Sequence, residues 1–264
     1  MIYIHLFTTD ISGLDLPSLV SDNIKISAII VPGNRKLSKK VAELKSRSDV
    51  PIFMHEMSSL LPENLPKADA GLSWLYSQII NPIDLKRYPL GILNMHGGKI
   101  PEYRGANVLQ WQIINGERQL GITWHELIKE VDAGPIWSER MIDIPGNANA
   151  LEMRLRMISE AKDLFPNAWK GFINKGEDYR IPDLKYGRIW PSRKPRDGRI
   201  GRFWTELKVR NMIRALCDPW PPATIQVDKD WVPVREVSNL SIKKGIPYAT
   251  ADNTIIYLLN DVNK

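Results

Sequence analysis

One strand-like segment of the sequence ends in two polar side chains that could do acid–base chemistry. Asn94 and His96 stand two positions apart at the end of the hydrophobic run Leu90–His96, and glycines follow them. Because side chains alternate between the faces of a strand, both would point to the same side. A histidine near its ordinary pKa accepts a proton at neutral pH, and an asparagine amide can donate to a developing oxyanion. Taken alone, such a pair is more often structural.

A carboxylate further along the chain could complete this pair. Asp132 lies in a turn-like sequence before Ala-Gly. If the fold brings it near His96, it would orient the ring and raise its basicity. Without a nearby activated serine or cysteine, the three side chains favour direct transfer over a covalent enzyme intermediate. The other histidines, His5, His55 and His125, match no such constellation, and we expect them to be non-catalytic.

Alternating strand and helix patterns are expected to position these residues. Amphipathic spacing at Leu37, Val41 and Leu44 predicts a helix between the second and third strands. Strands that alternate with helices indicate parallel βαβ units, so the predicted fold class is α/β, a Rossmann-like, mostly parallel sheet with helices on both faces. The strands are expected over Ile2–Phe7, Ile24–Val31, Pro51–Met54, Ala68–Tyr76 and Leu90–His96.

Beyond residue 105 the sequence predicts a helix, a pair of strands and a long second helix. The long helix begins near Asn149, where Glu152 follows at the spacing of a capping box. Pro166 is expected to kink or split it. The first helix and the strand pair are expected over Val108–Ile114, Gly121–His125 and Gly134–Trp137.

A change of composition near residue 186 suggests a boundary. Arginines, prolines and glycines between Arg188 and Arg202 indicate a solvated linker or, as the alternative, a nucleotide clamp. The expected domains are a catalytic domain at 1–185, a linker at 186–202 and a small C-terminal α+β or open-barrel module at 203–264.

Composition limits the classes of protein that remain. The 264 residues are 43% hydrophobic and 25% charged, as in an ordinary globular protein. The single cysteine excludes an intramolecular disulfide, and four histidines leave little material for a zinc site, so we expect no metal. No apolar run is long enough to cross a membrane, and the N-terminus lacks the features of a secretory signal, so we expect a cytoplasmic protein. The net charge of +6 fits a solvated surface or anionic partners.

A series of residues between Ser73 and Ile142 also matches, in order, the pattern of a known family. The matching positions are Asn94, His96, Pro101, Tyr103-Arg104-Gly105, Trp111, Gly116, Gly121-Ile122-Thr123 and Asp132-Ala133-Gly134. In this respect the chain resembles the formyltransferases that use 10-formyltetrahydrofolate. It departs from the family at Gly98, where the motif has serine, and at Val108, where relatives often have proline; both departures concern substrate-side contacts of the loop.

The resemblance implies that an Asn94–His96–Asp132 centre moves a formyl group from 10-formyltetrahydrofolate to an amine. It implies that His96 accepts the amine proton, that Asn94 stabilises the oxyanion and that Asp132 supports the proton movement. The folate would lie in a pocket beside this centre, bound by the backbone of the loop after the fourth strand. The cofactor-binding residues expected there are Tyr76, Ser77, Gln78 and Ile79.

Two further places are candidate substrate contacts. Arg104 could reach a phosphate or the sugar with its planar fork of donors, or it could pin its own turn. The turn formed by Thr8, Thr9 and Asp10 follows the first strand, where sheets of this type meet their substrates, and is a candidate contact for a diphosphate or ribose.

The acceptor amine is open among three choices. The segments Trp74–Tyr76 and Ala215–Pro222 look closest to formyltransferases of 4-amino-4-deoxysugars carried on a nucleoside diphosphate (dTDP, UDP or GDP), which serve lipopolysaccharide and O-antigen synthesis. The alternative, methionyl-tRNA formyltransferase, is typically longer, with a fuller basic domain for the RNA. Enzymes acting on glycinamide ribonucleotide are usually shorter.

The same residues also bear on alternative functions and on the expected binding partners. A hydrolase that releases formate, or an inactive nucleotide-binding module, would be a different use of this fold; an inactive module would be expected to lack Asn94, His96 or Asp132. We expect no nucleic-acid partner and no membrane insertion. A homodimer formed through the C-terminal module stays an open expectation.

Overall fold

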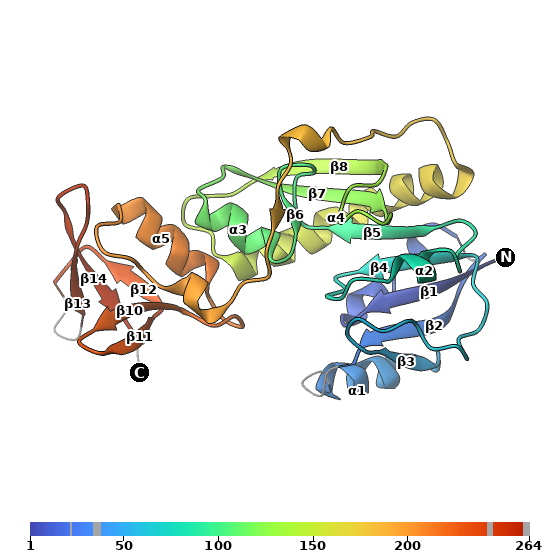
Figure 1. The fold of residues 1–264 in the computed structure, drawn as a ribbon, viewed down its shortest axis with the longest axis horizontal. Helices are drawn as coiled ribbons and strands as arrows, with labels where there is room; N and C mark the ends of the chain where they lie inside the picture. The colour runs from blue at the N-terminus through green and yellow to red at the C-terminus, as the bar shows by residue number, and fades with distance from the viewer. Residues whose placement is uncertain (22, 34–37, 242–244, 261–264) are drawn as a thin grey trace. The chain divides into compact units, whose positions relative to one another are not determined.

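The computed structural model describes residues 1–21, 23–33, 38–241 and 245–260 (Figure 1). The chain divides into two compact units, each assembled from separate stretches of sequence. The second unit includes two internal segments besides the C-terminal residues, which differs from the contiguous domains expected from the sequence. The first unit consists of Met1–Arg104, Gly121–Arg140 and Ser159–Ile189, and the second of Gly105–Leu120, Met141–Ile158 and Trp190–Lys264.

A seven-stranded sheet has the order β3-β2-β1-β4-β5-β7-β8. Strands β1 to β5 pair in parallel, and β7 runs antiparallel to β5. The predicted Rossmann-like, mostly parallel sheet is therefore confirmed. The strands are β1 (Ile2–Thr8), β2 (Ile24–Pro32), β3 (Ile52–His55), β4 (Ala70–Trp74), β5 (Ile92–His96), β7 (Gln119–Glu126) and β8 (Ile136–Asp143).

The α-helices are α1 (Ser38–Arg47), α2 (Pro82–Leu85), α3 (Val108–Ile114), α4 (Ala150–Asn174) and α5 (Glu206–Ala215). Helix α3 has the predicted bounds, and α1 includes two of the three residues whose spacing predicted it; Leu37 lies outside the described residues. Short 3₁₀ helices lie at Ile11–Gly13, Pro17–Leu19, Leu184–Tyr186 and Pro195–Gly198.

Helix α4 begins at the predicted capping box. The Asn149 amide donates to Glu152 Oε2 at 3.1 Å, and the Glu152 amide donates to Asn149 Oδ1 at 3.0 Å. The helix continues past Pro166 as one element, so of the expected kink or split the split does not occur. Phe165 and Trp169 beside the proline are buried, and their packing offsets the backbone hydrogen bond that proline cannot make.

Both faces of the sheet are covered, but by different kinds of element. On one face, Ile29 and Val31 of β2 pack with Leu44 of α1. Trp124 of β7 donates its indole N–H to the Ala161 carbonyl of α4 at 2.9 Å. The opposite face buries an apolar cluster whose cover comes from the segments after β3 and β4. That cluster, called here the loop-side cluster, contains Phe7, Ala28, Ile30, Leu61, Leu65, Ile80, Tyr88 and Ile92.

The second unit contains α3, α5 and small sheets. Strands β10 (Ala223–Val227) and β11 (Asp230–Val234) form an antiparallel pair. A three-stranded antiparallel sheet has the order β12-β14-β13, with β12 at Glu236–Ser238, β13 at Ile246–Ala249 and β14 at Ile255–Leu259. The expected small C-terminal α+β module therefore has its counterpart here. Within the expected linker, Ile189–Trp190 is strand β9, which pairs with β6 (Arg104–Gly105).

His5 on β1 should make folding sensitive to acid. It is buried, its Nδ1 lies 2.8 Å from the Tyr88 hydroxyl, and burial lowers its pKa to about 4. Between its unfolded value near 6.5 and pH 4, the unfolded chain binds a proton that the folded chain excludes, so stability is lost as pH falls. From pH 7 to pH 5 we expect the free energy of unfolding to fall by about 2 kcal/mol more in the wild type than in His5→Asn. Urea unfolding at both pH values measures this difference, and equal losses would contradict it.

Candidate active site

Two neighbouring strands place three polar side chains on the loop-side face of the sheet. The antiparallel pairing of β5 and β7 sets Asn94 directly opposite His125 and His96 opposite Thr123. Asn94 and His96 share a face by strand alternation, as predicted. The rings of His96 and His125 lie 6.1 Å apart, edge to face at 82°.

Asp132 reaches this group from the loop between β7 and β8. Its backbone has a φ of +45°, the left-handed conformation that turns the loop back over the strands. Its Oδ2 lies 3.5 Å from Nδ1 of His96, and its Oδ1 lies 3.4 Å from Nε2 of His125. The structure thus brings the predicted Asn94, His96 and Asp132 together, with the carboxylate between two imidazoles.

Hydrogen-bond partners fix where His96 carries its proton. Its Nε2 lies 2.5 Å from the Tyr103 carbonyl oxygen, which can only accept, so Nε2 is the donor. That leaves Nδ1, which faces Asp132, as the basic nitrogen of the neutral ring. The ring is nearly buried, at 7% exposure. A proton taken up at Nδ1 would place a positive charge between the carbonyl and the carboxylate, and both would stabilise it.

The amide of Asn94 is oriented by His125. His125 Nδ1 lies 3.1 Å from the Glu126 carbonyl, so Nδ1 carries the proton and Nε2 can accept. Asn94 Nδ2 donates to that Nε2 at 3.0 Å. An amide nitrogen has two hydrogens, so the second can donate to another acceptor. Asn94 is therefore held as a donor beside His96.

His125 is the member of this group that sequence reasoning missed. The expectation that it matches no constellation is wrong, because the antiparallel course of β7 sets it beside Asn94 and Asp132. Gly121, Thr123 and His125 alternate along one strand, which was a usable signal. The direction and register of that strand relative to β5 were needed to interpret it. His5 and His55 lie elsewhere, paired with Tyr88 and Tyr76.

Arg104 is buried and contacts the backbone beside Asp132. It is 8% exposed, and its Nη1 donates to the Val131 carbonyl at 3.3 Å. Its Nε is buried without a hydrogen-bond partner in the described part of the chain. The contact holds the loop that carries Asp132, whereas the pinning role expected from the sequence concerned the turn of Arg104 itself. A contact of Arg104 with substrate stays a prediction.

The polar groups of the turn after β1 form hydrogen bonds with one another. The buried Thr8 hydroxyl donates to the Asp10 carbonyl at 3.1 Å, and the Asp10 carboxylate accepts from the Ser12 amide at 3.0 Å. The Asp10 side chain thereby caps the short helix Ile11–Gly13. Thr9 is half-buried beside them. Substrate binding at Thr8, Thr9 and Asp10 stays a prediction, with the first and third side chains already committed to the turn.

The predicted cofactor-binding residues in the loop after β4 differ in their burial and contacts. Leu75 enters it with a φ of +52°. The side chain of Tyr76 turns inward and its hydroxyl lies 2.7 Å from His55 Nδ1. Ser77 is exposed, Ile79 is 74% exposed, and Gln78 Oε1 is buried without a hydrogen-bond partner in the described residues.

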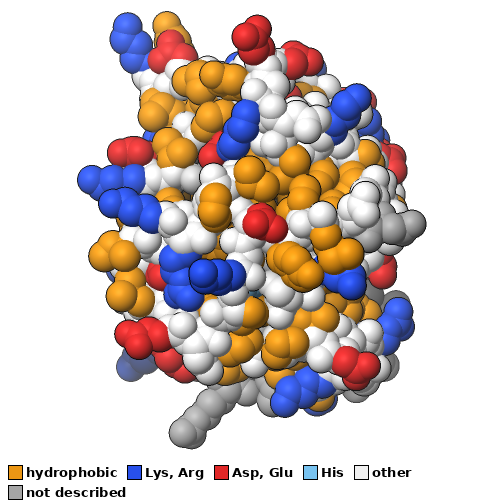
Figure 2. Space-filling view, turned by 90° about the vertical axis from the view of Figure 1, so that its right-hand side faces the viewer, with side chains coloured by type: hydrophobic (Ala, Val, Ile, Leu, Met, Phe, Trp, Pro, Cys, Tyr) orange, Lys and Arg blue, Asp and Glu red, His pale blue; other side chains and the backbone are white. Residues whose placement is uncertain are grey.

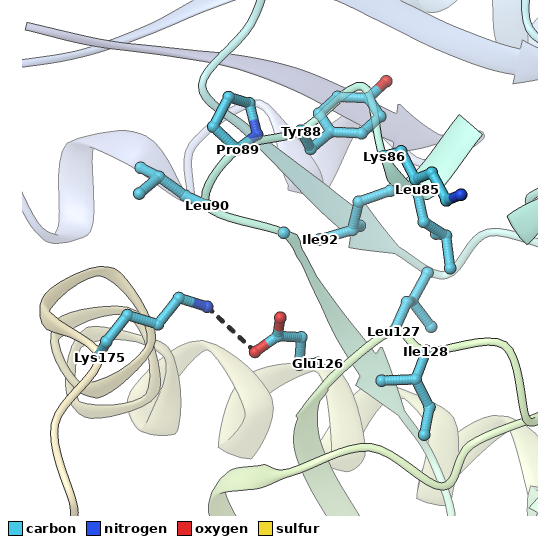
Figure 3. Close-up of a pocket in the computed structure, with 11 residues that line it drawn as sticks. Leu85, Lys86, Tyr88, Pro89, Leu90, Ile92, Glu126, Leu127, Ile128 and Lys175 are labelled. Atoms are coloured by element: carbon cyan, nitrogen blue, oxygen red, sulfur yellow. Dashed lines mark hydrogen bonds and ion pairs between the residues drawn. The ribbon is translucent and has the colours of Figure 1, made fainter. Parts of the chain in front are cut away.

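A pocket of about 310 Å³ lies in the first unit, at the start of β5 and the end of β7 (Figure 3). Its wall is apolar at Leu85, Ile92, Leu127 and Ile128, and Ile92 shares a strand face with Asn94 two positions on. At the other end, Lys175 pairs with Glu126 at 3.1 Å, the dashed contact in Figure 3.

The surface carries charges of both signs. On the face drawn in Figure 2, Lys and Arg side chains are interspersed with Asp and Glu among hydrophobic ones. Such mixing on this face does not provide the single-sign patch typical of a nucleic-acid surface.

In the described ranges, no group of three or more His, Cys, Asp or Glu is arranged to hold a metal ion. None of the described helices combines the length and apolarity needed to traverse a bilayer.

These features define an α/β protein with a cluster of polar and titratable side chains on two adjacent strands and the loop that follows them. The sequence pattern of a family described as formyl transferase matches residues 22–169. The chain therefore belongs to the formyl transferase family.

Solved structures of sugar formyltransferases share this fold. An N-formyltransferase from Helicobacter canadensis, solved with folinic acid and dTDP-3-aminofucose, has a TM-score of 0.73 at 15% identity, covering 98% of this chain and 99% of its own. WlaRD, a sugar 3N-formyl transferase solved with dTDP and 5-N-formyl-THF, gives 0.72 at 16% identity, with 99% of both chains covered. A 4-N formyltransferase from Francisella tularensis gives 0.72 at 18% identity, covering 88% of this chain and 96% of its own. At these identities the likeness establishes the fold.

Proposed function

We propose that this formyl transferase moves a formyl group from 10-formyltetrahydrofolate to the amine of a nucleoside-diphosphate-linked amino sugar, specifically a 4-amino-4-deoxysugar of lipopolysaccharide or O-antigen synthesis, in the cytoplasm. The observation that carries the proposal is the grouping of Asn94, His96 and Asp132 in a chain of the formyl transferase family. Of the structures with the same fold, one was solved with dTDP-3-aminofucose and folinic acid and another with dTDP and 5-N-formyl-THF.

The pocket has the features that a pterin ring requires. A pterin is flat, largely apolar on its faces and edged with hydrogen-bonding groups. The wall of Leu85, Ile92 and Leu127 suits its faces. Outside this pocket, in the loop at 75–80, Ser77 and Ile79 are exposed and Gln78 Oε1 is buried without a hydrogen-bond partner among the described residues. When bound, 10-formyltetrahydrofolate supplies the formyl group as the electrophile.

The residues of the centre divide the chemistry among them. Asn94 donates its second amide hydrogen to the formyl oxygen, where negative charge develops as the amine attacks. His96 accepts the amine proton at Nδ1 and can return it to the departing folate nitrogen. Asp132 stabilises the charged ring while it holds the proton. His125 keeps the Asn94 amide in its donating orientation.

The choice of an amino sugar over methionyl-tRNA rests on chain features. The residues after Arg202 are not markedly basic, and the face in Figure 2 has mixed charge. Proteins with the same fold include both a sugar 3N-formyl transferase and a 4-N formyltransferase. The 4-amino position is proposed from the segments Trp74–Tyr76 and Ala215–Pro222.

A mass-spectrometric screen tests the proposal. Purified protein is incubated with 10-formyltetrahydrofolate and a panel of dTDP-, UDP- and GDP-linked 3-amino and 4-amino sugars, with methionyl-tRNA as a parallel substrate. We expect one formyl group to be gained by a 4-amino sugar nucleotide, and none without the folate. Formylation of 3-amino sugars alone would overturn the ring position. Formylation of the tRNA alone, or release of formate without transfer, would overturn the sugar assignment.

A further inference from the structure

A buried histidine outside the acid–base centre holds the loop proposed to bind folate. His55 is the last residue of β3 and is fully buried. Its Nδ1 lies 2.7 Å from the hydroxyl of Tyr76, and its Nε2 lies 3.2 Å from the carbonyl oxygen of Ser59. The two rings are parallel within 7°, with centroids 6.2 Å apart. His55 thus joins the segment after β3 to the loop after β4.

The positions of the protons in this series of hydrogen bonds are determined by the groups at its two ends. The Ser59 carbonyl can only accept, so His55 Nε2 carries the hydrogen and Nδ1 accepts. The Tyr76 hydroxyl must then be the donor to Nδ1. Burial raises the pKa of Tyr76, so the hydroxyl keeps its proton. Every hydrogen in the relay from Tyr76 through His55 to Ser59 is therefore assigned, and the Tyr76 hydroxyl is directed toward His55.

The rest of the loop has less to hold it. Tyr76 packs edge-on against Phe7, with centroids 5.5 Å apart at 69°, and Ile80 enters the loop-side cluster. Between them, Ser77 and Ile79 are exposed. The backbone conformation of residues 77–79 thus depends on the two side chains that flank them. Of these two, only Tyr76 is fixed by a directional hydrogen bond as well as by packing.

We propose that His55 is a positioning residue for the cofactor loop, and that Tyr76 serves folate binding through its backbone while its hydroxyl anchors the loop to His55. This inference rests on the proposed function, because it gives the anchored loop its folate ligand. A loop already ordered before binding loses less conformational entropy when the ligand arrives, which strengthens binding. The sequence prediction of Tyr76 as a cofactor residue is thereby refined to an indirect role.

Three variants and a double mutant test this arrangement. Tyr76→Phe removes only the hydroxyl, and His55→Phe removes the acceptor but keeps a ring beside Tyr76. We expect each to weaken binding of folinic acid about three- to ten-fold, as expected for one hydrogen bond. The double mutant should bind no worse than either single mutant, because both remove the same contact. His5→Asn, which alters the other buried His–Tyr pair under the same face, is the matched control and should bind as the wild type does.

Kinetics and hydrogen exchange separate positioning from a general structural effect. With the sugar nucleotide saturating, the KM for 10-formyltetrahydrofolate should rise in both single mutants while kcat and the KM for the sugar stay unchanged. Peptide-resolved hydrogen exchange of the unliganded proteins should quicken at residues 75–80 in both, and not in His5→Asn. These readouts would not move together if His55 only contributed to overall stability.

The outcomes distinguish this inference from the proposed function. If the wild type binds folinic acid but both single mutants bind equally well, the anchoring role is wrong and the proposed function stands. If Tyr76→Phe alone weakens binding, the hydroxyl contacts the ligand directly and the relay is wrong. Additive losses in the double mutant would likewise overturn it. If the wild type neither binds nor turns over folate, the proposed function and the cofactor role fail together, and exchange at 75–80 still decides whether His55 anchors the loop.

Discussion

Replacing His96 by asparagine should lower kcat about 100- to 10,000-fold, because the variant loses the base that accepts the amine proton. The neutral His96 ring has its basic nitrogen, Nδ1, directed at Asp132, and its other nitrogen is held by the Tyr103 carbonyl. Asp132→Asn should lower kcat by a similar order, since the amide cannot stabilise the imidazolium as a carboxylate does. Turnover with both substrates saturating is the measurement.

The control for these two variants is folding. His96 and Asp132 keep 7% and 12% of their side chains exposed, and asparagine retains hydrogen-bonding groups at both positions, so we expect only a modest loss of stability. Thermal unfolding and binding of folinic acid should therefore stay close to the wild type. Near-normal turnover in both variants would show that the centre has been assigned to the wrong residues.

Replacing Asn94 by alanine should lower kcat about 100- to 1,000-fold, the range expected when an oxyanion loses one oriented donor. The KM values should change less, because the donor acts mainly on charge that develops during the reaction. His125→Gln should cost less than Asn94→Ala, since it disturbs only the partner that orients the amide. Steady-state kinetics of the two variants side by side measures the difference, and an equal or larger loss in His125→Gln would give His125 a direct role.

The parallel part of the sheet could be predicted from the sequence because each buried strand is a short hydrophobic run between turn residues. Strand β1 was expected to end at Phe7 and ends at Thr8, and α3 has its predicted bounds. The capping box at Asn149 was equally visible, since it depends on two residues at a fixed spacing. Helix α2 and strand β13 were missed; each is four residues long and too short to show a period.

The long-range features could not be predicted in the same way. The meeting of Asp132 with His96 was a conditional expectation, because it depends on a left-handed turn far along the chain. His125 entered the group only through the direction of β7. The division into units was also hidden, since the second unit collects three separate stretches of sequence. Spacing along a chain reports neighbours on one element; it does not report which elements pair.

Because β5 pairs with β7 in antiparallel register, the length of the connection before β7 determines which β7 side chains face Asn94. Side chains on β7 alternate, with His125 toward the centre and Trp124 toward α4. A single-residue deletion between Gly116 and Gln119 could shift β7 by one position. The indole of Trp124 would then face Asn94, and the imidazole of His125 would face the apolar core under α4. We therefore expect the connection before β7 to differ in length between family members by even numbers of residues, whatever its sequence, because only an even change keeps the same side chains on the same face.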